Sequence, residues 1–259
     1  MDAARTVAVF NYGHFTAMRA EDGRVRGLGL HLERLDRDAR LVFGEGVDAE
    51  AVKAAIRAEL GERTEAMNVR VNVFSPEVSM STLDNIVTPT TLVTVRPAAP
   101  WPDSAMHVRS VVYERDLPQV KHVGTFGLLL QRRLARLAGY DDALFVNRSG
   151  HISEGTVWNV GFYDGSRVVL PTAPALPGVT IHLTCKGLRR MGIPVEMRRL
   201  TLADLPSFRS AFATNEAIAT QPISSVDEVE FTVDDELNSL LRRAYLSNPA
   251  EPLALRGEG

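Results

Sequence analysis

Lysine, cysteine and long apolar runs are scarce in this chain of 259 residues, and each scarcity narrows what the protein can be. Only three of its 29 basic side chains are lysines, so chemistry that needs an amine able to lose its proton has three candidates. The single cysteine, Cys185, cannot form an internal disulfide, and its helical surroundings indicate a packing residue. No apolar run approaches the roughly 18 residues of a membrane span, and the start does not resemble a signal peptide. We therefore expect a cytoplasmic protein with no membrane partner.

The overall composition is that of an ordinary globular protein. Hydrophobic residues make up 45% of the chain, which is enough for one large core or two adjoining ones. A net charge of −3 argues against nucleic acid as a partner. No cluster of cysteine and histidine has the spacing of metal ligands, so no metal site is expected.

Extended and helical patterns alternate along the first half. Residues 6–10 and 15–19 are predicted to form short strands, and apolar residues at helical spacing then predict a helix that ends at Gly44. A second helix is predicted over 52–60. Further strands are predicted over 68–73, 92–95 and 108–113.

The second half contains more turn signals. Strands are predicted over 143–146 and 156–163, and a helix from about 181 to 191. Another helix is predicted to end at Gly139, and its apolar stripe consists of Phe126, Leu129, Leu130, Leu134 and Leu137.

A proline-rich stretch suggests how the chain divides into domains. Three prolines and Trp101 lie between Pro97 and Asp103, a composition typical of a linker edge. We predict a mixed α/β fold of two domains, with a smaller N-terminal α/β domain over 1–114 and a larger C-terminal domain over 115–259.

Lys121 differs from the other two lysines in its surroundings. Lys53 and Lys186 fall on predicted helices, whereas Lys121 lies at a junction between an extended segment and a helix. A lysine suits such a place if its amine must attack a carbonyl, because a guanidinium stays protonated. The alternative is a surface lysine that precedes a helix.

Two further positions have both a functional and a structural interpretation. Glu154 follows a turn, where a carboxylate is either exposed or holds a cationic partner inside a cleft. Gly178 and Thr180 begin a predicted helix, whose free N–H groups and dipole suit a phosphate. Thr180 could equally be the N-cap of a structural helix.

The order of these pieces resembles the class IV aminotransferases, which use pyridoxal 5′-phosphate (PLP). The family includes branched-chain aminotransferases, D-amino acid aminotransferases and aminodeoxychorismate lyases. The resemblance extends from about residue 11 to 227 and is more specific in the second half. The matching motifs are His31-Leu32-Glu33-Arg34-Leu35, Val120-Lys121, Gly139-Tyr140-Asp141-Asp142-Ala143-Leu144, Gly150-His151-Ile152-Ser153-Glu154-Gly155, Asn159 and Leu176-Pro177-Gly178-Val179-Thr180.

The resemblance implies a role for each matching residue. Lys121 would form the Schiff base with PLP and carry the proton between substrate and cofactor carbons. Glu154 would pair with the pyridine nitrogen, and Arg34 would bind the phosphate. Val179 and Thr180 would hold the same phosphate through helix-start N–H groups. The family's last phosphate-contacting turn matches Asn215 and Glu216, where we expect only the Glu216 backbone to face the cofactor.

Several positions depart from the family pattern. Branched-chain enzymes have a tyrosine five residues after the lysine, whereas this chain has Phe126 at that position. Aminodeoxychorismate lyases also lack the tyrosine. Glu216 stands where transaminases place threonine or serine, and Ile181 where an arginine is usual. The loop over 11–16 is about two residues shorter than in the family. The substrate pocket is therefore the least transferable part.

Three functions are compatible with these residues. The first is an aminotransferase that moves an amino group between an amino acid and a 2-oxo acid. The second is a PLP-dependent lyase of the aminodeoxychorismate lyase type, favoured by Phe126 and by Asn215 followed by Glu216. The third is a PLP-binding protein without turnover. The resemblance also implies a homodimer.

Overall fold

The computed structural model describes residues 9–254, which form two compact units. The first unit contains residues 9–99, 120–124 and 249–254, and the second contains residues 100–119 and 125–248. The units thus divide at Pro100 rather than at residue 115. Residues 120–124 return to the first unit because their backbone bonds to that of residues 13–15, a long-range pairing that sequence patterns do not show.

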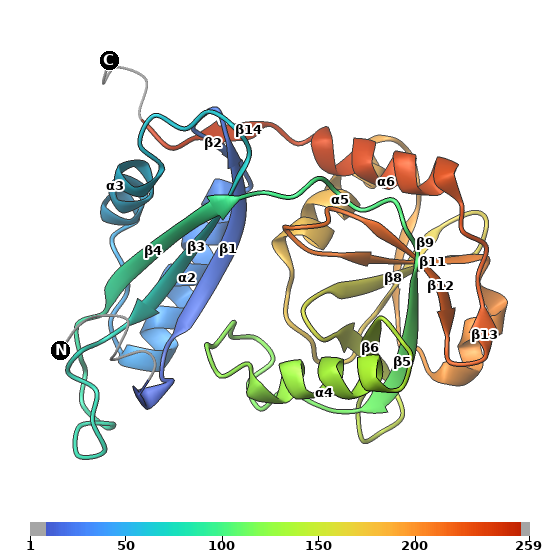
Figure 1. The fold of residues 1–259 in the computed structure, drawn as a ribbon, viewed down its shortest axis with the longest axis horizontal. Helices are drawn as coiled ribbons and strands as arrows, with labels where there is room; N and C mark the ends of the chain where they lie inside the picture. Colours follow the sequence, from blue (N-terminus) through green and yellow to red (C-terminus); the bar gives the residue numbers. More distant parts are fainter. Residues whose placement is uncertain (1–8, 255–259) are drawn as a thin grey trace. The chain divides into compact units, whose positions relative to one another are not determined.

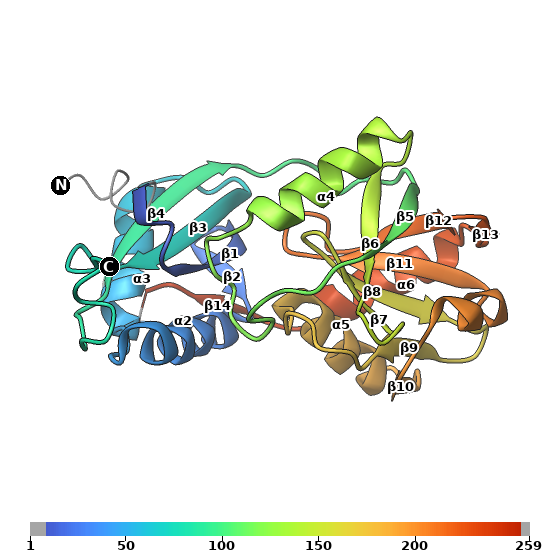
Figure 2. The same ribbon diagram turned by 90° about the horizontal axis from the view of Figure 1, so that it is seen from below.

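Five antiparallel strands form the sheet of the first unit (Figure 1). Their order is β14 (Ala250–Pro252), β2 (Arg24–Arg26), β1 (His14–Glu21), β3 (Met67–Phe74) and β4 (Thr90–Pro97). Helices α2 (Leu28–Phe43) and α3 (Ala49–Leu60) cover one face of this sheet (Figure 2). Val69, Val71 and Val73 alternate along β3 toward these helices and are fully buried, so this face carries the core of the unit.

Local sequence signals account for the ends of both helices. Gly44 adopts a left-handed conformation (φ 80°) and its N–H bonds to the Arg40 carbonyl, which ends α2. The Asp48 side chain accepts the Glu50 N–H and caps the start of α3. The predicted helices and the strand over 15–19 are confirmed. The strand over 6–10 was wrong in its described part, because Val9 and Phe10 are helical, and residues 6–8 lie outside the described range.

Nine strands form the sheet of the second unit. Along the sheet they are β10 (Val195–Arg198), β9 (Val168–Pro171), β8 (Asn159–Tyr163), β11 (Ser210–Thr214), β12 (Gln221–Val226), β5 (Met106–Val112), β6 (Asp142–Val146) and β7 (Ile152–Gly155), and β13 (Val229–Glu230) pairs with β12. The extended segment predicted over 156–163 was too long, because β8 begins at Asn159. The mixed α/β class predicted from the sequence is confirmed.

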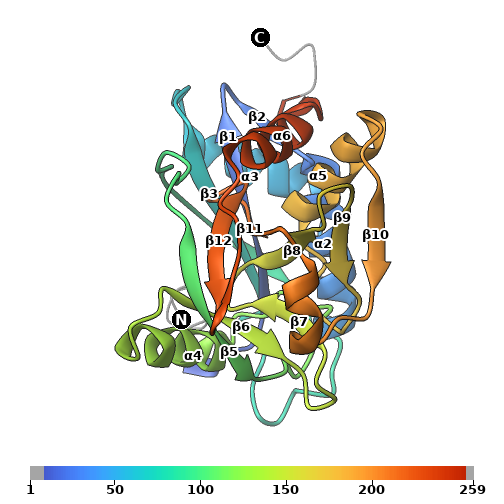
Figure 3. The ribbon, with the colours of Figure 1, turned by 90° about the vertical axis from the view of Figure 1, so that its right-hand side faces the viewer.

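Two groups of helices pack on separate parts of this second sheet (Figure 3). Helices α5 (Val179–Arg190) and α6 (Asp235–Leu246) pack together and share a core with β9 and β11, whereas α4 (Phe126–Leu137) packs on β5 and β6. A short 3₁₀ helix, η1 (Leu202–Ser207), follows β10. Among residues 9–254, no helix has both the length and the apolar character needed to cross a membrane.

The apolar stripe of helix α4 lies on the exposed side of the helix. Its bounds agree with the prediction, but within the helix Leu128 and Ala135 are the buried residues. The predicted stripe is exposed instead, with Phe126 at 76% and Leu137 at 68%. The predicted helix is confirmed, and the apolar stripe that indicated it faces away from the core of the unit.

Candidate functional site

The backbone of Lys121 is fixed to the end of β1 in the first unit. Its carbonyl accepts the Phe15 N–H at 2.8 Å, and the Val123 N–H bonds to the Gly13 carbonyl at 2.9 Å. The Lys121 N–H donates to Oδ2 of Asp38 at 3.3 Å. The Lys121 ammonium lies 4.8 Å from the centre of the Phe15 ring, a cation–π distance. A half-buried amine is thus held on an ordered segment of irregular backbone.

Helix α2 turns an unusual row of polar side chains inward. His31, Arg34 and Asp38 follow one another at spacings of three and four residues, which places them on one face of the helix. All three are buried, and Arg34 is only 7% exposed. The His31 Nδ1 lies 2.7 Å from the Thr16 hydroxyl of β1. This unit therefore brings Arg34 near Lys121, and the electrostatic effect of both on His31 is consistent with that proximity.

Two buried histidines beside these cations remain neutral near pH 7. Burial, together with the charges of Arg34 and Lys121, lowers the pKa of His31 to about 3. Burial, with a smaller effect of Arg37, lowers the pKa of His14 to about 4. Neither ring nitrogen of His14 has a hydrogen-bond partner among residues 9–254. Positive charge in this part of the site therefore comes from arginine and lysine.

We expect acid to destabilise the fold through these two histidines. Their folded pKa values lie below the unfolded value of 6.5, so the unfolded chain binds protons first as the pH falls. The stability they contribute is present above pH 6.5 and is lost as the pH falls from 6.5 to the folded values, about 4 for His14 and about 3 for His31. At pH 5.5 each should cost about 1 kcal/mol relative to pH 7.5.

Urea unfolding at the two pH values measures this loss. His14→Phe should remove about half of it, because phenylalanine fills the space without a proton-binding group. His107→Gln, at an exposed histidine, is the control and should leave the pH dependence unchanged. An equal pH dependence in wild type and His14→Phe would contradict the assignment.

Glu154 is buried within β7 in the second unit. Its Oε1 accepts the Arg115 Nε–H at 2.8 Å and the Leu176 N–H at 3.2 Å. Both side chains of the ion pair are 4% exposed. A buried carboxylate is tolerated when a cation and hydrogen bonds compensate it. The sequence left open whether Glu154 is exposed at a turn or holds a cation inside a cleft, and the structure shows that it is buried and paired with Arg115.

The start of α5 presents backbone N–H groups without a side-chain cap. Gly178 is the N-cap, so Val179 and Thr180 are the first two helical residues. No side chain caps the N–H groups of this first turn. This excludes the interpretation of Thr180 as the N-cap. A Cβ at position 178 would collide with Oδ1 of Asn159, whose Nδ2 donates to the Leu176 carbonyl at 2.8 Å. Asn159 thereby fixes the segment that precedes α5 and leaves no space for a side chain at position 178.

Asn215 organises the turn that contains Glu216. Its Oδ1 accepts the N–H groups of Ala217 and Ile218 at 2.8 and 3.0 Å, and its Nδ2 donates to the Val157 carbonyl. The side chain of Asn215 is thus used inside the turn. Glu216 is half-buried in this turn.

The predicted site residues form two sets. Arg34 and Lys121 belong to the first unit, and Glu154, Val179, Thr180, Asn215 and Glu216 belong to the second. Sequence reasoning missed Asp38 and Arg115, which contact the backbone of Lys121 and the side chain of Glu154. These pairs are 83 and 39 residues apart, and no local pattern links them.

A second buried carboxylate stabilises the segment after Glu154, and it belongs to a motif to which the sequence analysis gave no role. Asp142 accepts bonds from the Thr156 hydroxyl at 2.7 Å and the Trp158 indole at 3.0 Å, and Arg132 lies 3.2 Å away. Asp142 is fully buried, so these partners must satisfy its oxygens. They connect residues 156–158 to β6.

The family model for amino-transferase class IV matches residues 13–226. The chain therefore belongs to the class IV aminotransferases, a family of transaminase enzymes, as the sequence motifs predicted. A probable branched-chain-amino-acid aminotransferase of Rickettsia bellii is 27% identical over 253 residues, covering 89% of this chain and 84% of the relative.

Solved structures share the fold at lower identity. A branched-chain aminotransferase from Thermoproteus uzoniensis with norvaline has a TM-score of 0.83 at 20% identity, covering 96% of this chain and 92% of that one. A candidate 4-amino-4-deoxychorismate lyase from Legionella pneumophila has a TM-score of 0.77 at 20% identity, covering 92% and 93%. A PLP-bound hypothetical aminotransferase from Mycobacterium tuberculosis has a TM-score of 0.78 at 20% identity, covering 93% and 91%.

Proposed function

We propose that this protein binds PLP and transfers an amino group between an amino acid and a 2-oxo acid. The observation that carries the proposal is the placement of Lys121, whose backbone is fixed by Asp38 and β1, in a unit that also buries Arg34. The family match and the PLP-bound structural neighbour support the choice of cofactor.

The predicted site residues are of the types that bind the phosphate and the pyridine nitrogen of PLP. The uncapped start of α5 and the guanidinium of Arg34 are groups that bind a phosphate. The buried Glu154 carboxylate is a group that pairs with a protonated pyridine nitrogen. When bound, PLP supplies an aldehyde carbon that amines attack and a ring that accepts electrons.

The chain's own residues supply positioning and proton transfer. Lys121 would provide the nucleophilic amine and then carry a proton on Nζ. Asp38 orients the Lys121 segment through a backbone bond, and the Arg115 and Leu176 bonds prevent rotation of the Glu154 carboxylate. In the proposed assignment, Asn215 shapes the turn of Glu216, and the backbone of that turn would face the phosphate.

A lyase of the aminodeoxychorismate type is the second candidate function. Phe126 lacks the hydroxyl of the branched-chain enzymes, and Asn215 followed by Glu216 departs from the transaminase turn. The structural neighbour from Legionella pneumophila shows that the fold accommodates a protein described as such a lyase.

One absorbance experiment separates the candidate functions. The purified protein is incubated with PLP and freed of excess cofactor, and a panel of amino acids is then added one at a time. Loss of the yellow colour, with return on addition of a 2-oxo acid, supports amino transfer. Pyruvate release from aminodeoxychorismate without amino transfer supports the lyase. A protein that never becomes yellow would contradict both.

Arg34→Ala is expected to weaken PLP binding about ten- to hundredfold. The substitution removes charge-assisted hydrogen bonds worth about 1.5–3 kcal/mol. A titration followed by PLP absorbance gives the dissociation constant, and turnover at saturating PLP should fall less. Arg40→Ala, on the exposed side of the same helix, is the matched control. Equal dissociation constants for the two variants would remove Arg34 from the phosphate site.

We also propose that the protein is a homodimer and that α4 contributes to its interface. Contiguous exposed apolar side chains mark surfaces that associate. Leu134→Glu on the exposed stripe should shift the sedimentation coefficient toward that of a monomer, whereas Arg133→Ala on the same helix should not. A monomeric wild-type protein would refute this proposal. The stripe consists of Phe126, Leu129, Leu130, Leu134 and Leu137.

A further inference from the structure

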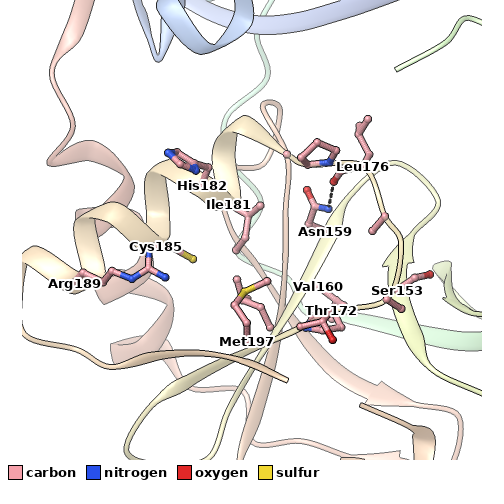
Figure 4. Close-up of a pocket in the computed structure, with 16 residues that line it drawn as sticks. Ser153, Asn159, Val160, Thr172, Leu176, Ile181, His182, Cys185, Arg189 and Met197 are labelled. Carbon is pink, nitrogen blue, oxygen red and sulfur yellow. Dashed lines mark hydrogen bonds between the residues drawn. The ribbon is translucent and has the colours of Figure 1, made fainter. Parts of the chain in front are cut away.

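A cavity of about 390 Å³ lies within the second unit, beside α5 (Figure 4). Its walls come from α5, from β8 and β9, from the edge strand β10 and from the loop over 172–178. This volume lies within the range of roughly 300–1,000 Å³ that is usual for small-molecule sites. None of the functions proposed above uses this cavity.

The cavity is distinct from the groups assigned to PLP. Ser153 lines it and Glu154 does not. Successive side chains of a strand point to opposite faces, so the cavity is on the side of β7 away from the Glu154 carboxylate. Val179 and Thr180 do not line it either. The two sites share a wall only at Asn159 and at the segment 176–178.

The lining has an apolar middle and one cationic end. Figure 4 shows Ile181, Cys185 and Met197 between Arg189 on one side and Thr172 on the other. Met197 is 56% exposed, a large apolar side chain that the fold leaves uncovered. Its position on the rim would allow a ligand to cover it.

Arg189 supplies the charge of this cavity. It is exposed, and no carboxylate among residues 9–254 forms an ion pair with it. Its charge acts on the Cys185 thiol, so the two groups are close together. An unpaired guanidinium at the edge of an apolar cavity is complementary to a ligand with one anionic group and an apolar body.

We propose that this cavity is an accessory binding site for an aliphatic monocarboxylate. The carboxylate pairs with Arg189, and the hydrocarbon chain packs against Ile181, Cys185 and Met197. Two features of recognition follow. Affinity should fall about fourfold for each CH₂ removed from the chain, and it should depend on the charge at position 189.

Cys185 provides a local readout, because it is the only cysteine in the chain. Burial raises the pKa of its thiol to about 11, and the Arg189 charge partly offsets this rise. Labelling by N-ethylmaleimide should therefore be slow at neutral pH and measurable near pH 9. A ligand in the cavity covers the thiol and slows the labelling further.

The experiment uses the full chain loaded with PLP and octanoate as the probe. Octanoate should slow Cys185 labelling several-fold, and octanol at equal concentration should do so less. The octanoate concentration that gives half-maximal protection should rise about tenfold in Arg189→Met. Lys186→Met removes the same charge from the same helix outside the cavity and should leave this concentration unchanged. Hexanoate should require about fifteenfold more than octanoate.

Two outcomes would overturn the proposal. One is protection by octanoate no greater than by octanol, and the other is an Arg189→Met variant that matches Lys186→Met. Calorimetric titration with octanoate measures the affinity of wild type and of both variants directly. It therefore tests the same difference without the cysteine label. Neither variant alters a residue assigned to PLP, so the result does not depend on the proposed amino transfer.

Discussion

Lys121→Ala should abolish amino transfer and remove the borohydride-reducible bond between protein and cofactor. The loss should reach at least about a thousandfold, because the variant lacks both the nucleophilic amine and the group that moves the proton. Lys121→Arg should be equally inactive, since a guanidinium does not give up its proton at neutral pH. Mass spectrometry after borohydride reduction locates the modified residue.

The fold of Lys121→Ala should remain intact. The bonds to Phe15 and Asp38 use the Lys121 backbone, which alanine retains. Unfolding free energies within about 1 kcal/mol of wild type are expected, because the substitution removes only the cation–π contact between the half-buried Lys121 and Phe15. Lys53→Ala and Lys186→Ala are the matched controls and should keep both activity and label. A phosphopyridoxyl group found on Lys53 or Lys186 would show that the assignment of Lys121 is wrong.

Glu154→Gln should slow exchange of the substrate α-hydrogen while PLP binding is retained. Glutamine keeps the size and an acceptor for the Leu176 N–H, but it lacks the negative charge that favours a protonated pyridine ring. The effect should appear in the rate, because the charge matters most where electrons move into the ring. Deuterium exchange at the substrate α-carbon, in single turnover, measures it.

The buried ion pair with Arg115 requires a second variant. Glu154→Gln leaves a buried guanidinium without its carboxylate, which alone can cost several kcal/mol of stability. Glu154→Gln combined with Arg115→Gln removes both charges and should recover stability without recovering exchange. Exchange rates within about threefold of wild type, a difference under roughly 0.7 kcal/mol, would mean that Glu154 is not the pyridine partner.

Much of the local structure could be predicted from the sequence. The helix ending at Gly44 and the alternation of valines along β3 follow from glycine conformation and from the two-residue period of a strand. These signals depend on neighbouring residues, so a single sequence is sufficient to detect them. The strand prediction was wrong at Val9 and Phe10, because a short apolar run does not distinguish a strand from a helix.

The description of the candidate site required both the sequence and the tertiary structure. An ordered set of motifs led to Lys121, Arg34 and Glu154, and these roles stay predictions until they are tested. The ion pair between Arg115 and Glu154 came only from the tertiary structure. A buried charge needs a partner nearby in space, and sequence order does not restrict which residue that is.

The sequence by itself determined the family, the α/β class and the positions of most helices and strands in the first half. Periodicity, turn residues and motif order are properties of the chain alone. Tertiary structure decided how Asp38 anchors Lys121, how Asn159 requires Gly178, and which face of α4 is exposed. These features arise from contacts between distant segments, and such contacts form only when the folded chain brings their surfaces together.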